Sequence, residues 1–430
     1  MIHGVRISLV FGLFALQMSL DANGVTGDDI HLGVASCATG VCHGKLTPQK
    51  DKNVWLNEYR VWSADDQHAR AYQTLLAPES KAIADKLGIA SAQTSELCLN
   101  CHTDNVKQSQ RGAKFQLSDG IACEACHGGG ARWIETHAET TATHTDNLTK
   151  GMYATEQPAA RAKLCIGCHL GAEDRFATHR IMGAGHPRLS FELDAFSTNQ
   201  PAHYTVDEDY LRRKGHIEGF NLWLAGQLAS AQRFVDLASG HWLRGTETMY
   251  PELAFYDCHA CHHPMDDARW SRRVAGAGIA PGSLRLQTDH LLILQAISEI
   301  LDPGAVNTLA VATNGFVRAG QRNDAAVSEA AASIGKWLAA HANDWTQRSF
   351  SKAQVADVRR SLVRYGAEGR MGDFAAAEQT FLGVESLSLY LGDADRLRGA
   401  LDALFKSVED DARFAPAKFA AAAKSLQGVL

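Results

Sequence analysis

Residues 98–102 read Cys98-Leu99-Asn100-Cys101-His102, a C-x-x-C-H motif that recurs along the chain. Residues at i, i+3 and i+4 lie on one side of a helical turn, so each such motif directs two thiols and an imidazole to a common side. Three further copies keep this spacing, and a stretched first copy has four residues between its cysteines: Cys123-Glu124-Ala125-Cys126-His127, Cys165-Ile166-Gly167-Cys168-His169, Cys258-His259-Ala260-Cys261-His262 and Cys37-Ala38-Thr39-Gly40-Val41-Cys42-His43.

The motif predicts covalent attachment of haem c. Its two thiols can form thioethers with the vinyl groups of one haem, and its imidazole can bind the iron as the proximal ligand. We therefore predict five haem c groups with their irons, attached through Cys37 and Cys42, Cys98 and Cys101, Cys123 and Cys126, Cys165 and Cys168, and Cys258 and Cys261. The predicted proximal ligands are His43, His102, His127, His169 and His262.

Two other uses of paired cysteines fit the pattern less well. Zinc ribbons contain C-x-x-C pairs, but they do not need a histidine directly after the second cysteine. Redox-active C-x-x-C pairs occur beside a strand–helix–strand pattern, and this sequence shows no such alternation.

The distal side of each iron separates electron transfer from ligand chemistry. An iron between two imidazoles is saturated and only passes electrons, whereas an open position can bind and activate a ligand. Of the 19 histidines, 14 lie outside the proximal positions. The candidate distal ligands are His68, His137, His144, His179, His186 and His290, and weaker candidates are His31, His203, His216, His241 and His259.

Local patterns favour some of these histidines. His68 lies in residues 62–72, which we expect to be helical, and His137 and His144 would share a face if their Thr-rich segment is a helix. His290 lies on an apolar helical stripe, where it is either a core histidine or an axial ligand.

Composition excludes several classes of protein. With 45% hydrophobic and 21% charged residues, the chain is neither disordered nor a multispanning membrane protein. A net charge of -6 argues against a nucleic-acid binder held by a basic field.

The N-terminus predicts export. Residues 7–20 form an apolar run after Arg6, which suits a secretory signal and is shorter than the roughly 20 residues that cross a bilayer. We expect a signal peptide over residues 1–22, with an uncleaved anchor as the alternative. Both place the rest of the chain in the periplasm or otherwise outside the cytoplasm, and no later run predicts a membrane span once the signal is removed.

The distribution of cysteines and histidines predicts two domains. Residues 23–278 hold every motif, and at about 45 residues per haem they are too few to build a separate core around each, so the haems would form much of the core. Residues 279–430 read as an all-helical bundle or helical-repeat domain. There, Val355, Val358, Leu362 and Tyr365 follow a helical period behind a capping box of Ser351 and Gln354.

The motif-bearing half resembles the multihaem c-type cytochromes that include the cytochrome c-552/c-554 electron carriers. It is more distantly similar to hydroxylamine oxidoreductase and to multihaem nitrite and tetrathionate reductases. The resemblance covers roughly residues 31–265 and rests on residues 62–69, 120–128, 184–193 and 223–227. It implies a mostly helical haem stack with His68 and His186 as distal ligands. The chain departs from the pattern in its fifth site and its stretched first motif, and it has no C-x-x-C-K motif of the kind found in many nitrite reductases.

These features favour an exported five-haem electron-transfer protein that exchanges electrons with other redox proteins and has no catalytic residues. The alternative is a haem-dependent oxidoreductase, in which one iron lacks a distal ligand and acts on a small nitrogen or sulfur compound. In that case Arg132, Arg175, Arg180 or Arg188 could position an oxyanion. A third interpretation makes the chain one subunit of a larger redox complex.

Overall fold

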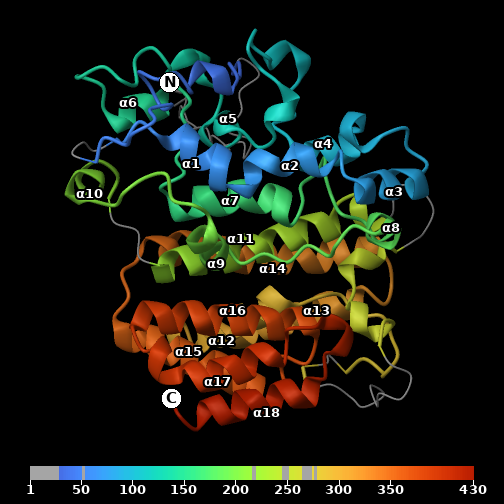
Figure 1. Ribbon diagram of the computed structural model, residues 1–430. Helices are drawn as coiled ribbons and strands as arrows, with labels where there is room; N and C mark the ends of the chain where they lie inside the picture. Colours follow the sequence, from blue (N-terminus) through green and yellow to red (C-terminus); the bar gives the residue numbers. More distant parts are fainter. Residues whose placement is uncertain (1–28, 51–53, 216–218, 245–250, 264–273, 276–277) are drawn as a thin grey trace, which may run out of the picture.

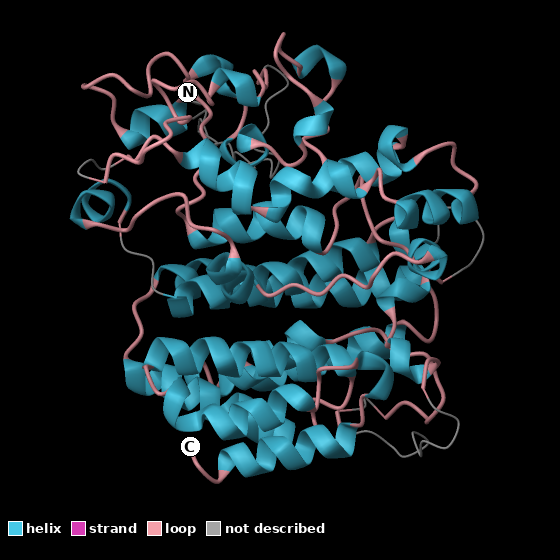
Figure 2. Cartoon of the chain, in the orientation of Figure 1, coloured by secondary structure: helices cyan, strands magenta, loops and turns pink. Residues whose placement is uncertain are grey.

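The computed structural model describes residues 29–50, 54–215, 219–244, 251–263, 274–275 and 278–430 (Figure 1). Within these ranges the chain forms helices and turns, and its only β structure is three isolated bridges (Figure 2). The prediction of a mostly helical protein is confirmed. The predicted signal peptide lies outside the described residues.

Short helices joined by long loops make up the N-terminal half. Three of them end at the histidine of a C-x-x-C-H motif, so the motif forms the last turn of the helix, as its spacing predicts. The helices are α1 (Glu58–Asp65), α2 (Ala71–Thr74), α3 (Pro78–Leu87), α4 (Glu96–His102), α5 (Cys123–His127), α6 (His144–Thr149), α7 (Pro158–His169), α8 (His179–Ala184), α9 (Leu193–Asn199) and α10 (Glu208–Lys214).

Longer helices make up the C-terminal half, and local sequence signals set several of their ends. Ser351 and Gln354 form the predicted capping box of α15, and Pro416 opens α18. Gly392, in the left-handed conformation, ends α16. The helices are α11 (Gly219–Ser239), α12 (Asp289–Leu301), α13 (Val306–Ala319), α14 (Asp324–Gln347), α15 (Lys352–Ala367), α16 (Phe374–Leu391), α17 (Ala394–Lys406) and α18 (Pro416–Gln427).

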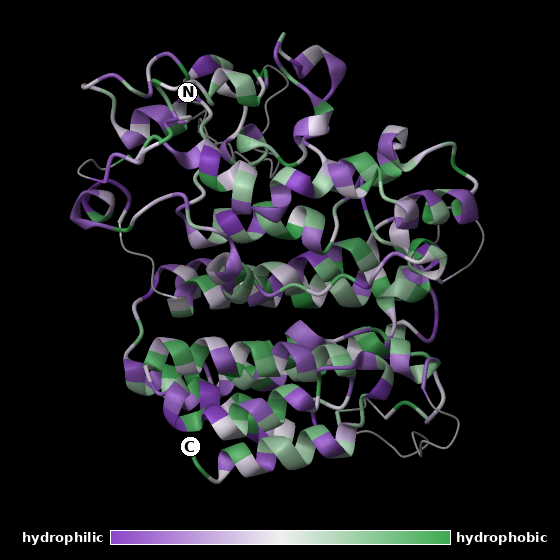
Figure 3. Cartoon of the chain, viewed as in Figure 1, coloured by the Kyte–Doolittle hydropathy of each residue, from purple (hydrophilic) through white to green (hydrophobic). Residues whose placement is uncertain are grey.

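The main apolar core lies among these long helices. Helix α11 packs against α12, α14 and α16, while α15 packs against α12, α16 and α18. Trp223, Phe316 and Tyr365 are completely buried in this core, and Figure 3 shows hydrophobic residues along the helices that enclose it. Because α11 precedes residue 278, the core extends across the predicted boundary between residues 278 and 279.

Two smaller apolar clusters lie beside the motifs. In one, Ala162 and Ile166 of α7 pack with Leu222 and Ala225 of α11, so the helix that carries the fourth motif rests on the main bundle. The other contains Leu99 of α4.

Among the described residues, no helix combines the length and apolar character needed to cross a membrane.

Candidate haem-binding sites

We number the motifs 1 to 5 in chain order, from residues 37–43 to residues 258–262. All ten cysteines are free thiols, so no disulfide occupies the sulfur atoms of any motif. Cys42 of motif 1 and Cys261 of motif 5 are exposed, whereas the other eight cysteines are partly buried. The two end motifs are therefore the more accessible ones.

Each motif histidine faces a second histidine from elsewhere in the chain. The two rings are nearly parallel in the pair of motif 1 (19°), nearly perpendicular in those of motifs 2, 3 and 4 (88°, 82° and 89°), and inclined by 38° in that of motif 5. The pairs, with the distance between ring centres, are His43 and His137 (6.1 Å), His102 and His186 (6.4 Å), His127 and His203 (6.2 Å), His169 and His68 (6.1 Å), and His262 and His179 (6.2 Å).

These distances suit a metal ion between the two rings of each pair. An imidazole nitrogen binds a transition metal at about 2 Å, so two rings on opposite sides of one ion have centres roughly 6.3 Å apart. A direct hydrogen bond between the rings would bring the centres to roughly 5 Å. The residues present therefore fit an iron ion held by two histidines at every motif.

Hydrogen bonds fix the orientation of half of the paired rings. In each case Nδ1–H donates to a protein oxygen, which leaves the Nε2 lone pair for a metal ion. The acceptors are the Glu58 carboxylate for His43 (2.8 Å), the Asp66 carboxylate for His68 (2.9 Å), and the backbone carbonyls of Ala71 for His102 (3.0 Å), Ile134 for His137 (2.6 Å) and Pro187 for His186 (2.8 Å).

Burial keeps several of the paired imidazoles neutral, which is the form that binds a metal ion. It lowers the pKa of His127 to about 3 and that of His169 to about 4. His43 differs, because its hydrogen bond to Glu58 raises its pKa. Burial also lowers the pKa of His102, His137 and His203.

Contacts between cysteines show which motifs are neighbours. The Cys37 thiol of motif 1 interacts with the Cys123 thiol of motif 3, and the Cys101 thiol of motif 2 interacts with the Cys168 thiol of motif 4. Cys126 of motif 3 also interacts electrostatically with Cys168. Motif 3 therefore lies next to motifs 1 and 4, and motif 4 lies next to motif 2.

Helix α8 connects motif 2 to motif 5. It begins at His179, which faces the histidine of motif 5, and ends two residues before His186, which faces that of motif 2. Together with the cysteine contacts, this gives the spatial order 1, 3, 4, 2, 5.

Two of the six candidate distal histidines lie outside the pairs. His144 Nε2 bonds to the Glu156 carboxylate (2.9 Å), because residues 133–143 form turns rather than the helix that would have aligned it with His137. His290 Nδ1 bonds to Gln227 Oε1 (2.8 Å) within the main core, which matches its interpretation as a core histidine. The four candidates found in pairs are His68, His137, His179 and His186.

The remaining partner is His203, which sequence reasoning ranked among the weaker candidates. It lies in the loop between α9 and α10, where no helical period marks a buried face. Its position opposite His127 depends on how this loop folds back over motif 3. The concentration of histidines in the motif-bearing half was the only sequence signal for it.

The glutamate that follows the first cysteine of motif 3, Glu124, has a structural role. Its carboxylate is buried and accepts hydrogen bonds from the backbone N–H groups of Leu32, Gly33 and Gly130, each at 2.7 Å. A buried carboxylate with three donors is well satisfied. It ties motif 3 to the segment that leads into motif 1.

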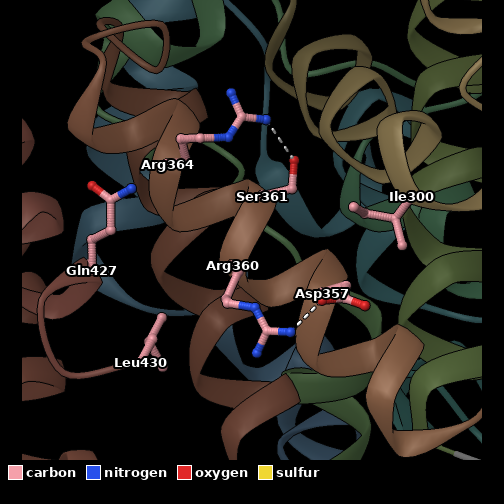
Figure 4. A pocket seen from close by; sticks show the side chains of 7 residues that line it. All are labelled: Ile300, Asp357, Arg360, Ser361, Arg364, Gln427 and Leu430. Carbon is pink, nitrogen blue, oxygen red and sulfur yellow. Dashed lines mark hydrogen bonds and ion pairs between the residues drawn. The ribbon is translucent and has the colours of Figure 1, made fainter.

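A cavity of about 340 Å³ lies away from the motifs, in the C-terminal helices (Figure 4). Its arginines are already paired, Arg360 with Asp357 and Arg364 with Glu299, so it offers no uncompensated positive charge for an anion. The lining residues are Ile300, Asp357, Arg360, Ser361, Arg364, Gln427 and Leu430.

The recurring motifs and the mostly helical fold are typical of multihaem c-type cytochromes. Residues 36–128, which span motifs 1 to 3, match the family model described as cytochrome c554 and c-prime. The resemblance to the cytochrome c-552/c-554 family predicted from the sequence is thus confirmed over residues 36–128. The long helices of the C-terminal half lie after this segment. This match over part of the chain is consistent with haem c as cofactor and with redox proteins as partners. Comparisons with the curated proteins and with the solved structures gave no match.

Proposed function

We propose that the chain is an exported electron-transfer protein that carries five haem c groups. The two cysteines of each motif would attach one haem, and the iron would lie between the motif histidine and its paired histidine. The observation that carries this proposal is that all five motif histidines face a second imidazole at 6.1 to 6.4 Å.

Bound haem c supplies reversible one-electron oxidation and reduction at its iron. The chain contributes two imidazoles to each site, and these would hold the iron. Hydrogen bonds at Nδ1 hold five of the rings in orientation, and burial keeps several neutral. With two histidines on each iron, no position on the iron would be left for a substrate. This arrangement favours electron transfer over catalysis.

The spatial order of the motifs supports a single path through the molecule. Motifs 1 and 5 are its two ends, and these are the motifs with an exposed cysteine, Cys42 and Cys261. An electron donor would dock near one end and an acceptor near the other. Docking of this kind depends on salt when charged groups guide it.

The oxidoreductase alternative needs an open iron and a free cationic group near it. The arginines that could have bound an oxyanion already have partners: Arg132 pairs with Asp29, Arg175 with Asp174 and Arg188 with Glu378, while Arg180 donates to the Leu87 carbonyl. Of these, Arg175 lies beside motif 4, where its Nη1 also contacts the Cys168 sulfur at 3.5 Å. Because these arginines already have partners, they support the electron-transfer function over the oxidoreductase.

In this proposal the C-terminal helices serve as a scaffold. Helix α11 supports α7, whose last turn is motif 4. His259 within motif 5 bonds through Nε2 to the Asp411 carbonyl (2.6 Å), just before α18. Export to the periplasm rests on the apolar N-terminal run and on the class of protein, since c-type cytochromes are typically exported.

Optical and magnetic spectra of the haem-loaded protein test the proposal. Five haems per chain, a wholly low-spin ferric spectrum and no carbon monoxide binding after reduction are expected. A high-spin fraction near one iron in five, with carbon monoxide bound to it, would favour the oxidoreductase instead. A count below five haems would contradict the assignment of the motifs.

A further inference from the structure

The five histidine pairs differ in the groups that hydrogen-bond to their outer nitrogens. In the pair of motif 1, His43 Nδ1 bonds to a carboxylate, that of Glu58 (2.8 Å). In the pair of motif 4, His68 Nδ1 bonds to the Asp66 carboxylate (2.9 Å). In the pair of motif 2 both acceptors are neutral backbone carbonyls. Negative charge is thus in direct contact with the rings of two pairs.

Both carboxylates are held in place by further hydrogen bonds. Glu58 opens α1, and its second oxygen accepts from the backbone N–H of Leu56 (3.1 Å). Asp66 is buried, and it accepts from the backbone N–H of His68 and from the Gln200 side chain, both at 2.9 Å. These contacts fix each carboxylate against its imidazole.

An anionic acceptor changes what the imidazole donates to a metal ion. A carboxylate that accepts the Nδ1 proton raises the basicity of Nε2 more than a backbone carbonyl does. A more basic ligand stabilises the ferric ion over the ferrous ion, and second-shell hydrogen bonding is one of the means by which proteins tune haem potentials.

We propose that Glu58 and Asp66 are positioning residues that lower the reduction potentials of the haems at motifs 1 and 4 below that of the haem at motif 2. This inference rests on the proposed function, because it requires that the histidine pairs ligate iron. In the spatial order 1, 3, 4, 2, 5, the two haems of low potential would then lie on either side of motif 3.

Magnetic spectra can tell these two haems apart. Nearly parallel axial imidazoles give a rhombic low-spin signal, whereas perpendicular ones give a strongly anisotropic signal at low field. The rings of the motif 1 pair are inclined by 19° and those of the motif 4 pair by 89°. The potential of each can therefore be followed in a redox titration of the intact protein.

The variants Glu58→Gln and Asp66→Asn keep an oxygen acceptor but remove its charge. In Glu58→Gln, the oxidised-to-reduced ratio of the rhombic component at a fixed potential should fall about tenfold, which is about 59 mV for a one-electron couple. In Asp66→Asn, the oxidised-to-reduced ratio of one anisotropic component should fall by a similar factor. The ratio of the rhombic component should not change. The matched control is Asp65→Asn, which removes an exposed charge one residue away and should shift neither.

Two further measurements keep the inference testable if a variant fails to mature. Glu58→Asp retains the carboxylate and should restore a potential nearer to that of the unaltered protein. In the unaltered protein, the rhombic component of the motif 1 haem should be reduced at a lower potential than at least one anisotropic component, that of motif 2. Unchanged potentials in both charge-removing variants, in a protein that is fully low-spin with five haems, would overturn this inference alone. A high-spin spectrum in the unaltered protein would contradict the proposed function instead.

Discussion

The imidazole rings of His43 and His137 are nearly parallel, with 6.1 Å between their centres and 19° between their planes. The pairs of motifs 2, 3 and 4 have rings inclined by 82° to 89°. If each pair ligates one iron, the oxidised protein should show one rhombic low-spin signal and three strongly anisotropic ones. The fifth pair, at 38°, should lie nearer the rhombic type. Electron paramagnetic resonance checks this, and five equivalent signals would contradict it.

Removal of a paired histidine should open one iron. His203→Ala takes away the ring opposite His127, so one haem in five should become high-spin and bind carbon monoxide when reduced. Optical titration with carbon monoxide measures the fraction. The controls are His144→Ala and His290→Ala, since these histidines bond to Glu156 and Gln227 and should leave the spectrum low-spin. A carbon monoxide complex in the controls, and none in His203→Ala, would reverse the assignment.

The sequence was sufficient to predict the features that depend on neighbours in the chain. The motif spacing predicts a turn that ends at the histidine, and α4, α5 and α7 do end there. The helical period and the caps of the C-terminal half likewise predict α15 and α18, because residues a few positions apart decide them.

Distal partners could not be predicted in the same way. His203 lies in a loop and meets His127 only through tertiary packing, so no local period distinguishes it from a surface histidine. His290 has the clearest helical pattern of all the candidates, but that pattern marks the core of the C-terminal helices. For the same reason, the change in composition near residue 278 did not reveal that α11 belongs to that core.

Glu192 should make the stability of the protein depend on pH. Its carboxylate is 1% exposed and accepts from the backbone N–H groups of Asp194 and Ala195, and burial raises its pKa from 4.5 to about 7. Between these values the folded state binds more protons than the unfolded state. The free energy of unfolding should therefore fall as pH rises through this window, by up to about 3 kcal/mol.

Thermal unfolding of the haem-loaded protein between pH 4.5 and pH 7 measures this dependence. Glu192→Gln should flatten the curve, because its side chain does not ionise. Glu173→Gln, at an exposed position in the loop before α8, should keep the slope of the unaltered protein. An equal slope in all three proteins would show that Glu192 does not set it.

Haem removal should affect the two halves differently. Helices α11 to α18 share the large apolar core, whereas the motif-bearing half has only small apolar clusters, and its paired histidines would face one another across empty space. A chain whose ten cysteines are replaced by serine should therefore keep the C-terminal helices and lose the fold of residues 29–215. Limited proteolysis should yield a resistant fragment that begins near α11, and circular dichroism should show reduced helical content. The haem-loaded protein, digested in parallel, should resist cleavage throughout. Native-like helical content in the haem-free chain would show that the motif-bearing half does not need haem as its core.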